Sequence, residues 1–244
     1  LEEICGRLLM NLGKSPNFSK KSRSKQDIKF VIIHYTGMQS EIESIKRLQS
    51  PKHKVSCHYL INRKGNITQM VIDKNIAWHA GKSKWKKYIN LNKFSLGIEL
   101  INKGHQFGYQ NYSKNQIMSL IKLCKFLKKK YHIKSENFLG HSDIAPLRKI
   151  DPGEKFPWKK LSTFNIGRWP KQGGYKIKFN EQKIDNLFFR NLKKIGYRYF
   201  NINERKRTDK SIIKSFQRHY SPETVTGKID IKTLKISHFL VCQF

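Results

Sequence analysis

The chain has 244 residues, of which 38% are hydrophobic and 12% aromatic, so it can bury a core and is not disordered throughout. Its 50 Lys and Arg residues against 17 Asp and Glu give a net charge of +33, which suggests attraction to a polyanion. Lysine outnumbers arginine 39 to 11, however, and proteins that recognise nucleic-acid bases do so more often with arginine than with lysine. The composition therefore favours a lysine-rich solvated surface over a specific nucleic-acid-binding protein.

The four cysteines are far apart in the sequence, at Cys5, Cys57, Cys124 and Cys242. This spacing argues against zinc-finger and thioredoxin-type motifs. No apolar run is long enough for a membrane helix, so we expect no transmembrane segment.

The first part of the chain predicts an α/β domain. Residues 1–28 are expected to form a flexible N-terminal segment, because they become polar and rich in Lys and Ser. The run KFVIIHYTG then predicts a buried strand that carries His34 near its C-terminal end. The next elements are expected to be a helix over residues 40–49 with Ser40 as its N-cap, two strands over 56–71, a strand over 94–101, a helix over 114–131 and a short strand over 136–141.

The last part of the chain predicts a separate helical unit. Residues 171–180 contain KQGGY and are expected to form a linker. Over residues 181–244, two segments show helical periodicity, and a third follows a turn at Gly227 with Asp230 as N-cap. The predicted fold is therefore a mixed central β-sheet flanked by helices over residues 29–170, with a small C-terminal three-helix domain.

A group of ionisable residues near the end of the first domain predicts a metal site. Lys149 and Asp151 stand two apart before Pro152, and an extended segment would place them on one side. His141 follows a predicted strand, and His34 ends another, where α/β sheets place ligands. Two histidines and one aspartate suit zinc. Taken singly, each residue is better explained as a strand or turn cap, but the joint pattern favours one zinc per chain.

Five motifs in order resemble the zinc-dependent N-acetylmuramoyl-L-alanine amidases, which share a fold with phage T7 lysozyme and the peptidoglycan recognition proteins. The branch they resemble most is the bacterial 1,6-anhydro-muropeptide amidases. The motifs are VIIHYTG, SCHYLINRKGNITQMV, AWHAG, SLGIELIN and GHSDIAPLRKIDPGEKFPWKKL. The resemblance implies a catalytic domain over residues 29–170 that hydrolyses the amide between N-acetylmuramic acid and L-alanine in peptidoglycan or muropeptides.

The resemblance also implies residue roles. The metal ligands fall on His34, His141 and Asp151, and the catalytic residues on Glu99 and Lys149. Glu99 would move protons, and Lys149 would stabilise the tetrahedral oxyanion beside zinc.

Three further residues are expected to contact substrate. Trp78 and His79 belong to AWHAG, which in the family lines the cleft, and Arg148 is a candidate contact for the stem peptide. Their alternative roles are packing and surface solvation.

The C-terminal segment IIKSFQRHYSPETVTGKIDIKTL resembles three-helix peptidoglycan-binding modules. The alternative is a helical cap that binds nothing. The expected partners are peptidoglycan or muropeptides, in the cell envelope or periplasm, with the cytoplasm as the alternative. Two other functions stay open at this point: a non-catalytic peptidoglycan recognition protein, and a basic nucleic-acid-binding protein.

Overall fold

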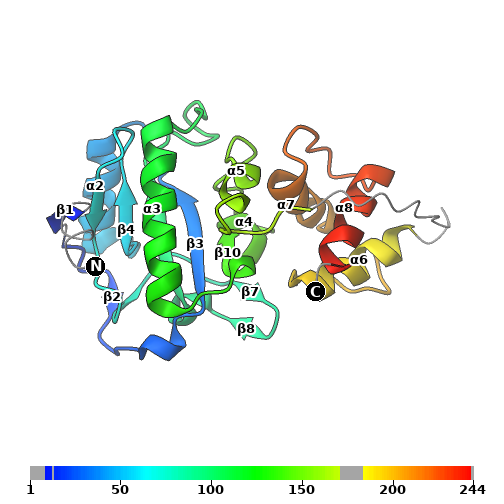
Figure 1. Ribbon diagram of the computed structural model, residues 1–244, viewed down its shortest axis with the longest axis horizontal. Helices are drawn as coiled ribbons and strands as arrows, with labels where there is room; N and C mark the ends of the chain where they lie inside the picture. The colour runs from blue at the N-terminus through cyan, green and yellow to red at the C-terminus, as the bar shows by residue number, and fades with distance from the viewer. Residues whose placement is uncertain (1–8, 13, 171–183, 243–244) are drawn as a thin grey trace.

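The computed structural model describes residues 9–12, 14–170 and 184–242 (Figure 1). The strands are β1 (Leu9–Leu12), β2 (Phe18–Ser19), β3 (Phe30–Tyr35), β4 (Tyr59–Ile61), β5 (Ile67–Gln69), β6 (Ile76–Ala77), β7 (Lys84–Trp85), β8 (Tyr88–Ile89), β9 (Ser95–Leu100) and β10 (Phe138–Gly140). The α-helices are α2 (Glu41–Gln49), α3 (Lys114–Tyr131), α4 (His141–Ile144), α5 (Trp158–Ser162), α6 (Ile184–Ile195), α7 (Asp209–Tyr220) and α8 (Ile231–Cys242). Short 3-10 helices are η1 (Lys25–Asp27), η2 (Pro51–His53), η3 (Leu91–Phe94) and η4 (Ser135–Asn137).

A six-stranded sheet forms the centre of the molecule, in the order β1-β5-β4-β9-β3-β10. The pair β4–β5 is antiparallel, and the other neighbours are parallel. The predicted mixed α/β architecture with helices on its faces is therefore confirmed. The two-stranded pairs β2–β6 and β7–β8 lie outside this sheet.

The two faces of the sheet differ in what they carry. Strand β9 reads SLGIEL, and its alternate residues Ser95, Gly97 and Glu99 lie on the face that also carries His34 of β3. The apolar residues between them point to the opposite face, where they join the cluster that contains the buried side of α3. The residues of the proposed site thus lie on one face of these two strands.

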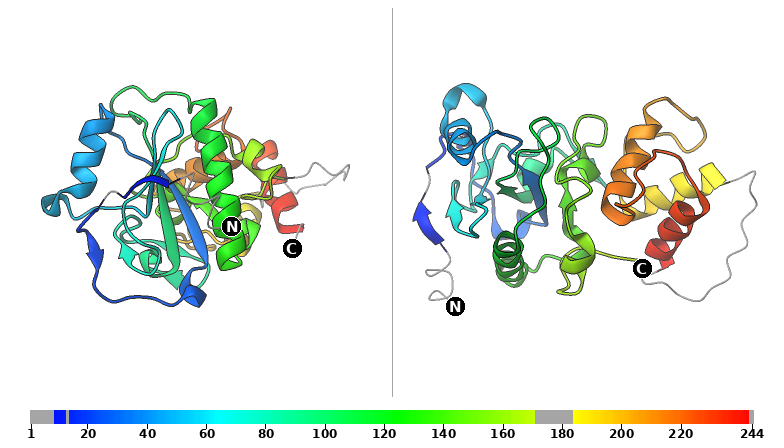
Figure 2. Two further views of the ribbon diagram at one scale, coloured as in Figure 1. Left: turned by 60° about the vertical axis from the view of Figure 1, so that its left-hand side comes forward. Right: turned by 90° about the horizontal axis from the view of Figure 1, so that it is seen from above.

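Helix α3 covers the apolar face, as Figures 1 and 2 show. The Ser113 hydroxyl accepts a hydrogen bond from the Gln116 backbone N–H at 3.1 Å, which caps the helix start. Leu120, Cys124 and Leu127 are fully buried at helical spacing. Both the helix bounds and its buried side agree with the periodicity of the sequence.

The segment before β3 is packed against the domain over residues 14–28, which corrects the expectation of a flexible segment there. Arg23 is only 9% exposed, and its guanidinium donates to the carbonyl oxygens of Asp73, Asn92 and Ser95 at 3.1, 2.9 and 2.7 Å. A lysine- and serine-rich composition does not reveal one buried arginine whose hydrogen bonds are accepted by backbone carbonyl oxygens inside the fold.

Helices α6, α7 and α8 form the C-terminal helical unit, and three helices are found where three were predicted. The Asp230 carboxylate accepts the Thr233 backbone N–H at 2.6 Å, so it does cap α8. Figure 2 shows the unit beside α4 and α5. The predicted linker over residues 171–180 lies outside the described residues.

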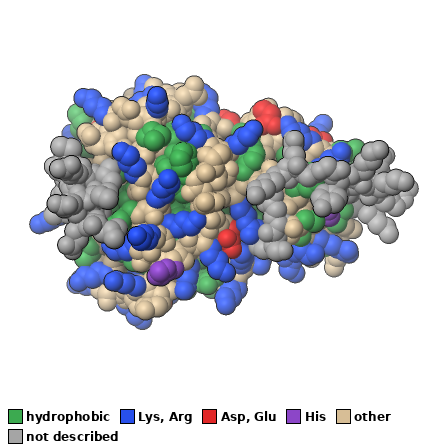
Figure 3. All heavy atoms as spheres, in the orientation of Figure 1, with side chains coloured by type: hydrophobic (Ala, Val, Ile, Leu, Met, Phe, Trp, Pro, Cys, Tyr) green, Lys and Arg blue, Asp and Glu red, His purple; other side chains and the backbone are tan. Residues whose placement is uncertain are grey.

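The face drawn in Figure 3 is rich in basic side chains. Lys and Arg side chains are scattered across the face drawn in Figure 3, with few acidic ones between them. Among the described residues, no helix has the length and apolar character that crossing a membrane requires.

Candidate metal centre

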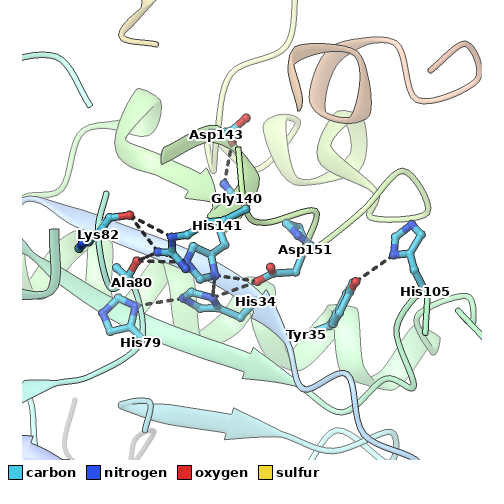
Figure 4. A network of polar contacts seen from close by, with 12 residues as sticks. His34, Tyr35, His79, Ala80, Lys82, His105, Gly140, His141, Asp143 and Asp151 are labelled. Carbon is cyan, nitrogen blue, oxygen red and sulfur yellow. Dashed lines mark hydrogen bonds and ion pairs between the residues drawn. The ribbon is translucent and has the colours of Figure 1, made fainter. Parts of the chain in front are cut away.

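Three side chains from distant parts of the chain converge at the C-terminal end of β3 (Figure 4). His34 is near the end of that strand, His141 is the first residue of α4, and Asp151 precedes Pro152. The two Nδ1 atoms are 3.0 Å apart, and each is 3.1 Å from Asp151 Oδ2. All three residues are buried, and in the described part of the chain no other group of this kind occurs.

The donor set fits a zinc ion. Burial and the charge of the neighbouring His141 lower the pKa of His34 to about 4, so its imidazole is neutral at physiological pH. Burial alone would raise the pKa of Asp151, but His141 and His34 hold it well below its usual range. Ligands about 2.0–2.1 Å from a tetrahedral zinc lie about 3.3 Å from each other, close to the spacing seen. With both Nδ1 atoms bare, three lone-pair donors face one another, which a cation stabilises.

The rear nitrogens of both histidines meet the loop that follows β6. His141 Nε2 lies 3.2 Å from the carbonyl oxygen of Ala80, and His34 Nε2 lies 3.0 Å from His79 Nδ1. His79 is only 6% exposed and lies beneath His34, so the structure gives it a buried place rather than one on a cleft wall. Trp78 is half-buried, and its indole N–H donates to Ser19 Oγ at 3.1 Å.

Glu99 lies directly beside His34, because the two residues are register partners on the parallel strands β9 and β3. Burial, reinforced by the charge of Asp151, raises the pKa of Glu99 to about 8. Its Oε2 atom is buried without a hydrogen-bond partner among the described residues. A carboxyl group in this state can hold or release a proton near neutral pH.

Lys149 and Arg148 have different surroundings. Lys149 is half-buried, and its charge acts to lower the pKa of both His34 and Glu99, which places it near the site. Arg148 is bound to the loop after β6: its guanidinium donates to the carbonyl oxygens of Ala80 and Lys82. Turns at residues 146–148 and 151–152 flank Lys149 and Ile150, which belong to no helix, strand or turn, and Ile150 is 36% exposed, so it does not point into the core.

Asp143 connects this site to the C-terminal helical unit. Its carboxylate, 1% exposed, accepts the Gly140 backbone N–H at 2.8 Å and so caps the start of α4. It also accepts the Tyr197 hydroxyl at 2.6 Å and the His219 Nδ1–H at 2.7 Å. The histidine packs flat on Trp158, with ring centroids 4.0 Å apart.

Sequence reasoning missed the residues that support the site. Ser95 is fully buried beneath His79, and Gly97 leaves the room that the His79 ring fills. The alternation of small and acidic residues at positions 95, 97 and 99 is the signal that could have found them, because it places all three on one face of the strand.

Comparison with known proteins gives consistent matches. A family model described as N-acetylmuramoyl-L-alanine amidase matches residues 24–154. The N-acetylmuramoyl-L-alanine amidase AmiD of Escherichia coli is 35% identical over 233 residues, covering 88% of this chain and 82% of the relative. The 1,6-anhydro-N-acetylmuramyl-L-alanine amidase AmpD of Haemophilus influenzae is 34% identical over 165 residues, covering 60% and 87%.

Solved structures extend the similarity to more than nine tenths of the chain. The complex of AmiD from Escherichia coli with the substrate anhydro-N-acetylmuramic acid-L-Ala-D-gamma-Glu-L-Lys superposes with a TM-score of 0.76 at 31% identity, covering 93% of this chain and 92% of that one. AmpDh3 from Pseudomonas aeruginosa superposes with a TM-score of 0.77 at 27% identity, covering 94% and 97%.

Proposed function

The chain belongs to the N-acetylmuramoyl-L-alanine amidase family, and we propose that His34, His141 and Asp151 hold the zinc ion with which it works, beside Glu99 and Lys149 as catalytic residues. It is an enzyme that hydrolyses the amide between N-acetylmuramic acid and L-alanine, including in anhydro-muropeptides. Catalysis is therefore confirmed over the alternative of non-catalytic recognition.

The proposed centre supplies Lewis-acid chemistry. A zinc ion bound there would polarise the scissile carbonyl and make a nearby water acidic at neutral pH. The protein's part is to hold the three ligands together and to keep the His34 imidazole neutral and the Asp151 carboxyl group ionised. Burial of all three excludes competing water from the donor atoms.

Glu99 is the proton carrier in this proposal. It lies beside His34 on the neighbouring strand, and one of its oxygens has no hydrogen-bond partner in the described part of the structure. The free oxygen can take a proton from the attacking water and return it to the departing amine of L-alanine. Its raised pKa suits both steps, because the group is poised between its two protonation states near neutral pH.

Lys149 is the proposed oxyanion stabiliser. An ammonium group cannot ligate a cation, so its place at the edge of the site serves the substrate instead. As the carbonyl becomes tetrahedral, negative charge develops on its oxygen, and a fixed cation lowers the energy of that state.

We further propose that the enzyme acts on wall polymer as well as on released fragments, in the cell envelope or periplasm. The support is the resemblance of the C-terminal helical unit to wall-binding modules. Cytoplasmic action on fragments alone is the alternative. Trp78 and Arg148 stay candidate substrate contacts through their exposed atoms.

The single observation that carries the metal assignment is the convergence of two imidazole nitrogens and one carboxylate oxygen within 3.1 Å beside Glu99. The test is to measure zinc by elemental analysis, and then to incubate the protein with sacculi and with a soluble anhydro-muropeptide. We expect about one zinc per chain and, by mass spectrometry, a free stem peptide from both substrates. A metal-free protein that zinc neither binds nor activates would overturn the mechanism; cleavage of the fragment alone would overturn the polymer assignment.

A further inference from the structure

Two consecutive residues of the AWHAG motif face the rear of both metal-binding histidines. His79 Nδ1 lies 3.0 Å from His34 Nε2, and the Ala80 carbonyl oxygen lies 3.2 Å from His141 Nε2. Arg148 Nη2 also comes within 3.3 Å of His141 Nε2, since both groups donate to that carbonyl oxygen. A carbonyl oxygen is always an acceptor, but an imidazole nitrogen accepts only in one tautomer. The His79 contact therefore needs a further explanation.

The hydrogen bonds of Ser95, which lies behind His79, fix the tautomer of His79. The Ser95 hydroxyl donates to the carbonyl oxygen of Leu91 at 2.6 Å, so its proton is committed there. The hydroxyl oxygen can then only accept from His79 Nε2, which lies 3.2 Å away. His79 consequently carries its proton on Nε2 and presents a bare Nδ1 to His34. His34 in turn carries its proton on Nε2, which leaves its own Nδ1 bare and facing the metal site.

The ring of His79 has little freedom to break this chain of hydrogen bonds. A methyl group at Gly97 would come within 2.4 Å of His79 Cγ, so the ring lies directly against that strand backbone. The Asn92 side-chain oxygen accepts the backbone N–H groups of both His79 and Ala80, at 3.1 and 2.6 Å. Both the backbone and the ring of His79 are thus held in one position.

We propose that His79 is a positioning residue that, through Ser95 and the Leu91 carbonyl, holds His34 in the one tautomer that can bind metal through Nδ1. The proposal rests on the zinc site proposed above. It assigns the histidine of AWHAG to the assembly of the metal centre rather than to substrate contact. Without the acceptor on His79, nothing in this chain of bonds keeps the His34 proton on Nε2, and the metal must displace the other tautomer before it binds.

A neighbouring histidine provides a matched control. His58 is also fully buried, and its ring centroid is 5.7 Å from that of His79. Its Nδ1 accepts the Gly97 backbone N–H at 3.0 Å, and its Nε2 lies 2.8 Å from an Arg23 nitrogen. It does not touch the three proposed metal ligands, so replacing it perturbs packing in the same place without altering the tautomer of His34.

The test compares His79→Leu, His79→Asn and the control His58→Asn in the full chain. Leucine fills the space without an acceptor, whereas asparagine places a carbonyl oxygen close to the position of Nδ1. Zinc dissociation constants are measured by competition with a chelator, after circular dichroism has shown that each metal-free variant is folded. We expect His79→Leu to bind zinc about 10- to 100-fold more weakly. His79→Asn should stay within about threefold of the parent, as should His58→Asn, because neither removes the acceptor for His34.

A second variant and a second measurement test the proposal if His79→Leu folds poorly. Ser95→Ala deletes one buried hydroxyl and frees His79 to take either tautomer, so it should weaken zinc binding in the same direction as His79→Leu. The visible spectrum of the cobalt-substituted protein should also change in His79→Leu and not in His58→Asn, because it reports ligand geometry. Parent-like zinc affinity in both His79→Leu and Ser95→Ala, or equal weakening in His58→Asn, would overturn the proposal. A parent that binds no zinc would instead overturn the metal assignment on which the proposal rests.

Discussion

Glu99 is a residue whose acid–base chemistry depends strongly on its surroundings. Burial raises its pKa to about 8, from 4.5 for an exposed glutamate. Between these pH values the folded chain holds a proton that the unfolded chain has lost. The free energy of unfolding that this group contributes is therefore largest below pH 4.5 and falls as the pH rises through 8.

This dependence can be measured with Glu99→Gln, which is neutral at every pH. At pH 4 we expect the metal-free variant to melt at the same temperature as the metal-free parent. As the pH rises towards 8, the parent should melt at a progressively lower temperature than the variant, because only the parent loses the contribution of protonated Glu99. Differential scanning calorimetry across that range provides the comparison. With zinc bound, the same variant should lose about 10²- to 10⁴-fold in turnover while keeping its metal. A difference in melting temperature between variant and parent that does not change with pH would contradict the raised pKa of Glu99.

Lys149 and Asp151 should have separable roles. Asp151→Ala deletes an anionic ligand, so we expect zinc to be lost or held weakly. Lys149→Ala should keep zinc and lower the rate by about 10²- to 10³-fold, because only the stabilisation of the oxyanion is removed. Zinc content and single-turnover rate on the two variants make the comparison, with the exposed Lys159→Ala as a charge-matched control. Loss of zinc from Lys149→Ala would rule out the oxyanion role.

At the residue scale, the sequence predicts ligands better than their supports. His34, His141 and Asp151 could be proposed as ligands because metal-binding side chains are few and their motifs are short, and the structure brings the three together. The proposed role of His79 could not be predicted, because it depends on which acceptor takes the single hydroxyl proton of Ser95. Hydrogen-bond direction is a property of three-dimensional contacts, and residue spacing carries no record of it.

Among the elements, α4 has the most unusual support. It is only four residues long, and it carries His141. Two side chains of the C-terminal helical unit, Tyr197 and His219, donate to Asp143 two residues further on, and the Ser215 hydroxyl donates to the Ser142 carbonyl at 2.7 Å. A turn this short has little stability of its own. The C-terminal helical unit therefore helps to position His141, a proposed metal ligand.

Tyr197→Phe tests this support. The change removes one hydroxyl that donates to a buried carboxylate, so we expect the free energy of unfolding to fall by about 1.5–3 kcal/mol. Urea unfolding followed by circular dichroism gives the value. Tyr199→Phe, in the same unit but without a bond to Asp143, is the control and should change it far less. Zinc affinity should also fall in Tyr197→Phe, since the carboxylate caps the helix that begins at His141.

Elements with strong periodicity were predictable, and those held by tertiary contacts were not. The helix over residues 114–131 follows from its apolar spacing and its Ser113 cap. The strand that carries Glu99 follows from its apolar residues. The hydrogen bonds of Arg148 to the loop after β6 join residues far apart in sequence, so spacing alone does not reveal them. The packing of residues 14–28 likewise depends on carbonyls far away in sequence.

At the scale of the whole molecule, one hydrophobic cluster joins the two parts of the chain. Phe30, Ile32 and Leu139 of the sheet belong to the same buried cluster as Phe188 and Phe216 of the C-terminal helical unit. The aromatic ring of Tyr197 lies 4.9 Å from that of Trp85, across the boundary between the parts. A boundary that buries a shared core behaves as the interior of one domain.

We therefore expect the metal-free protein to unfold in a single cooperative transition. Fluorescence and far-ultraviolet circular dichroism, recorded in the same urea titration, should give coincident midpoints. The alternative is a wall-binding module on a free linker, which would unfold separately and give two transitions. Two resolved midpoints would refute the shared core as a cooperative unit.

The shared cluster also affects how the protein is made. When the nascent chain has emerged from the ribosome up to residue 170, the sheet face that bears Phe30, Ile32 and Leu139 is exposed. The helices that cover this face have not yet emerged. Nascent chains with uncovered apolar surface are prone to aggregate. Because α6 and α7 complete this core, we expect the enzyme to become fully active only after most of its chain has been translated.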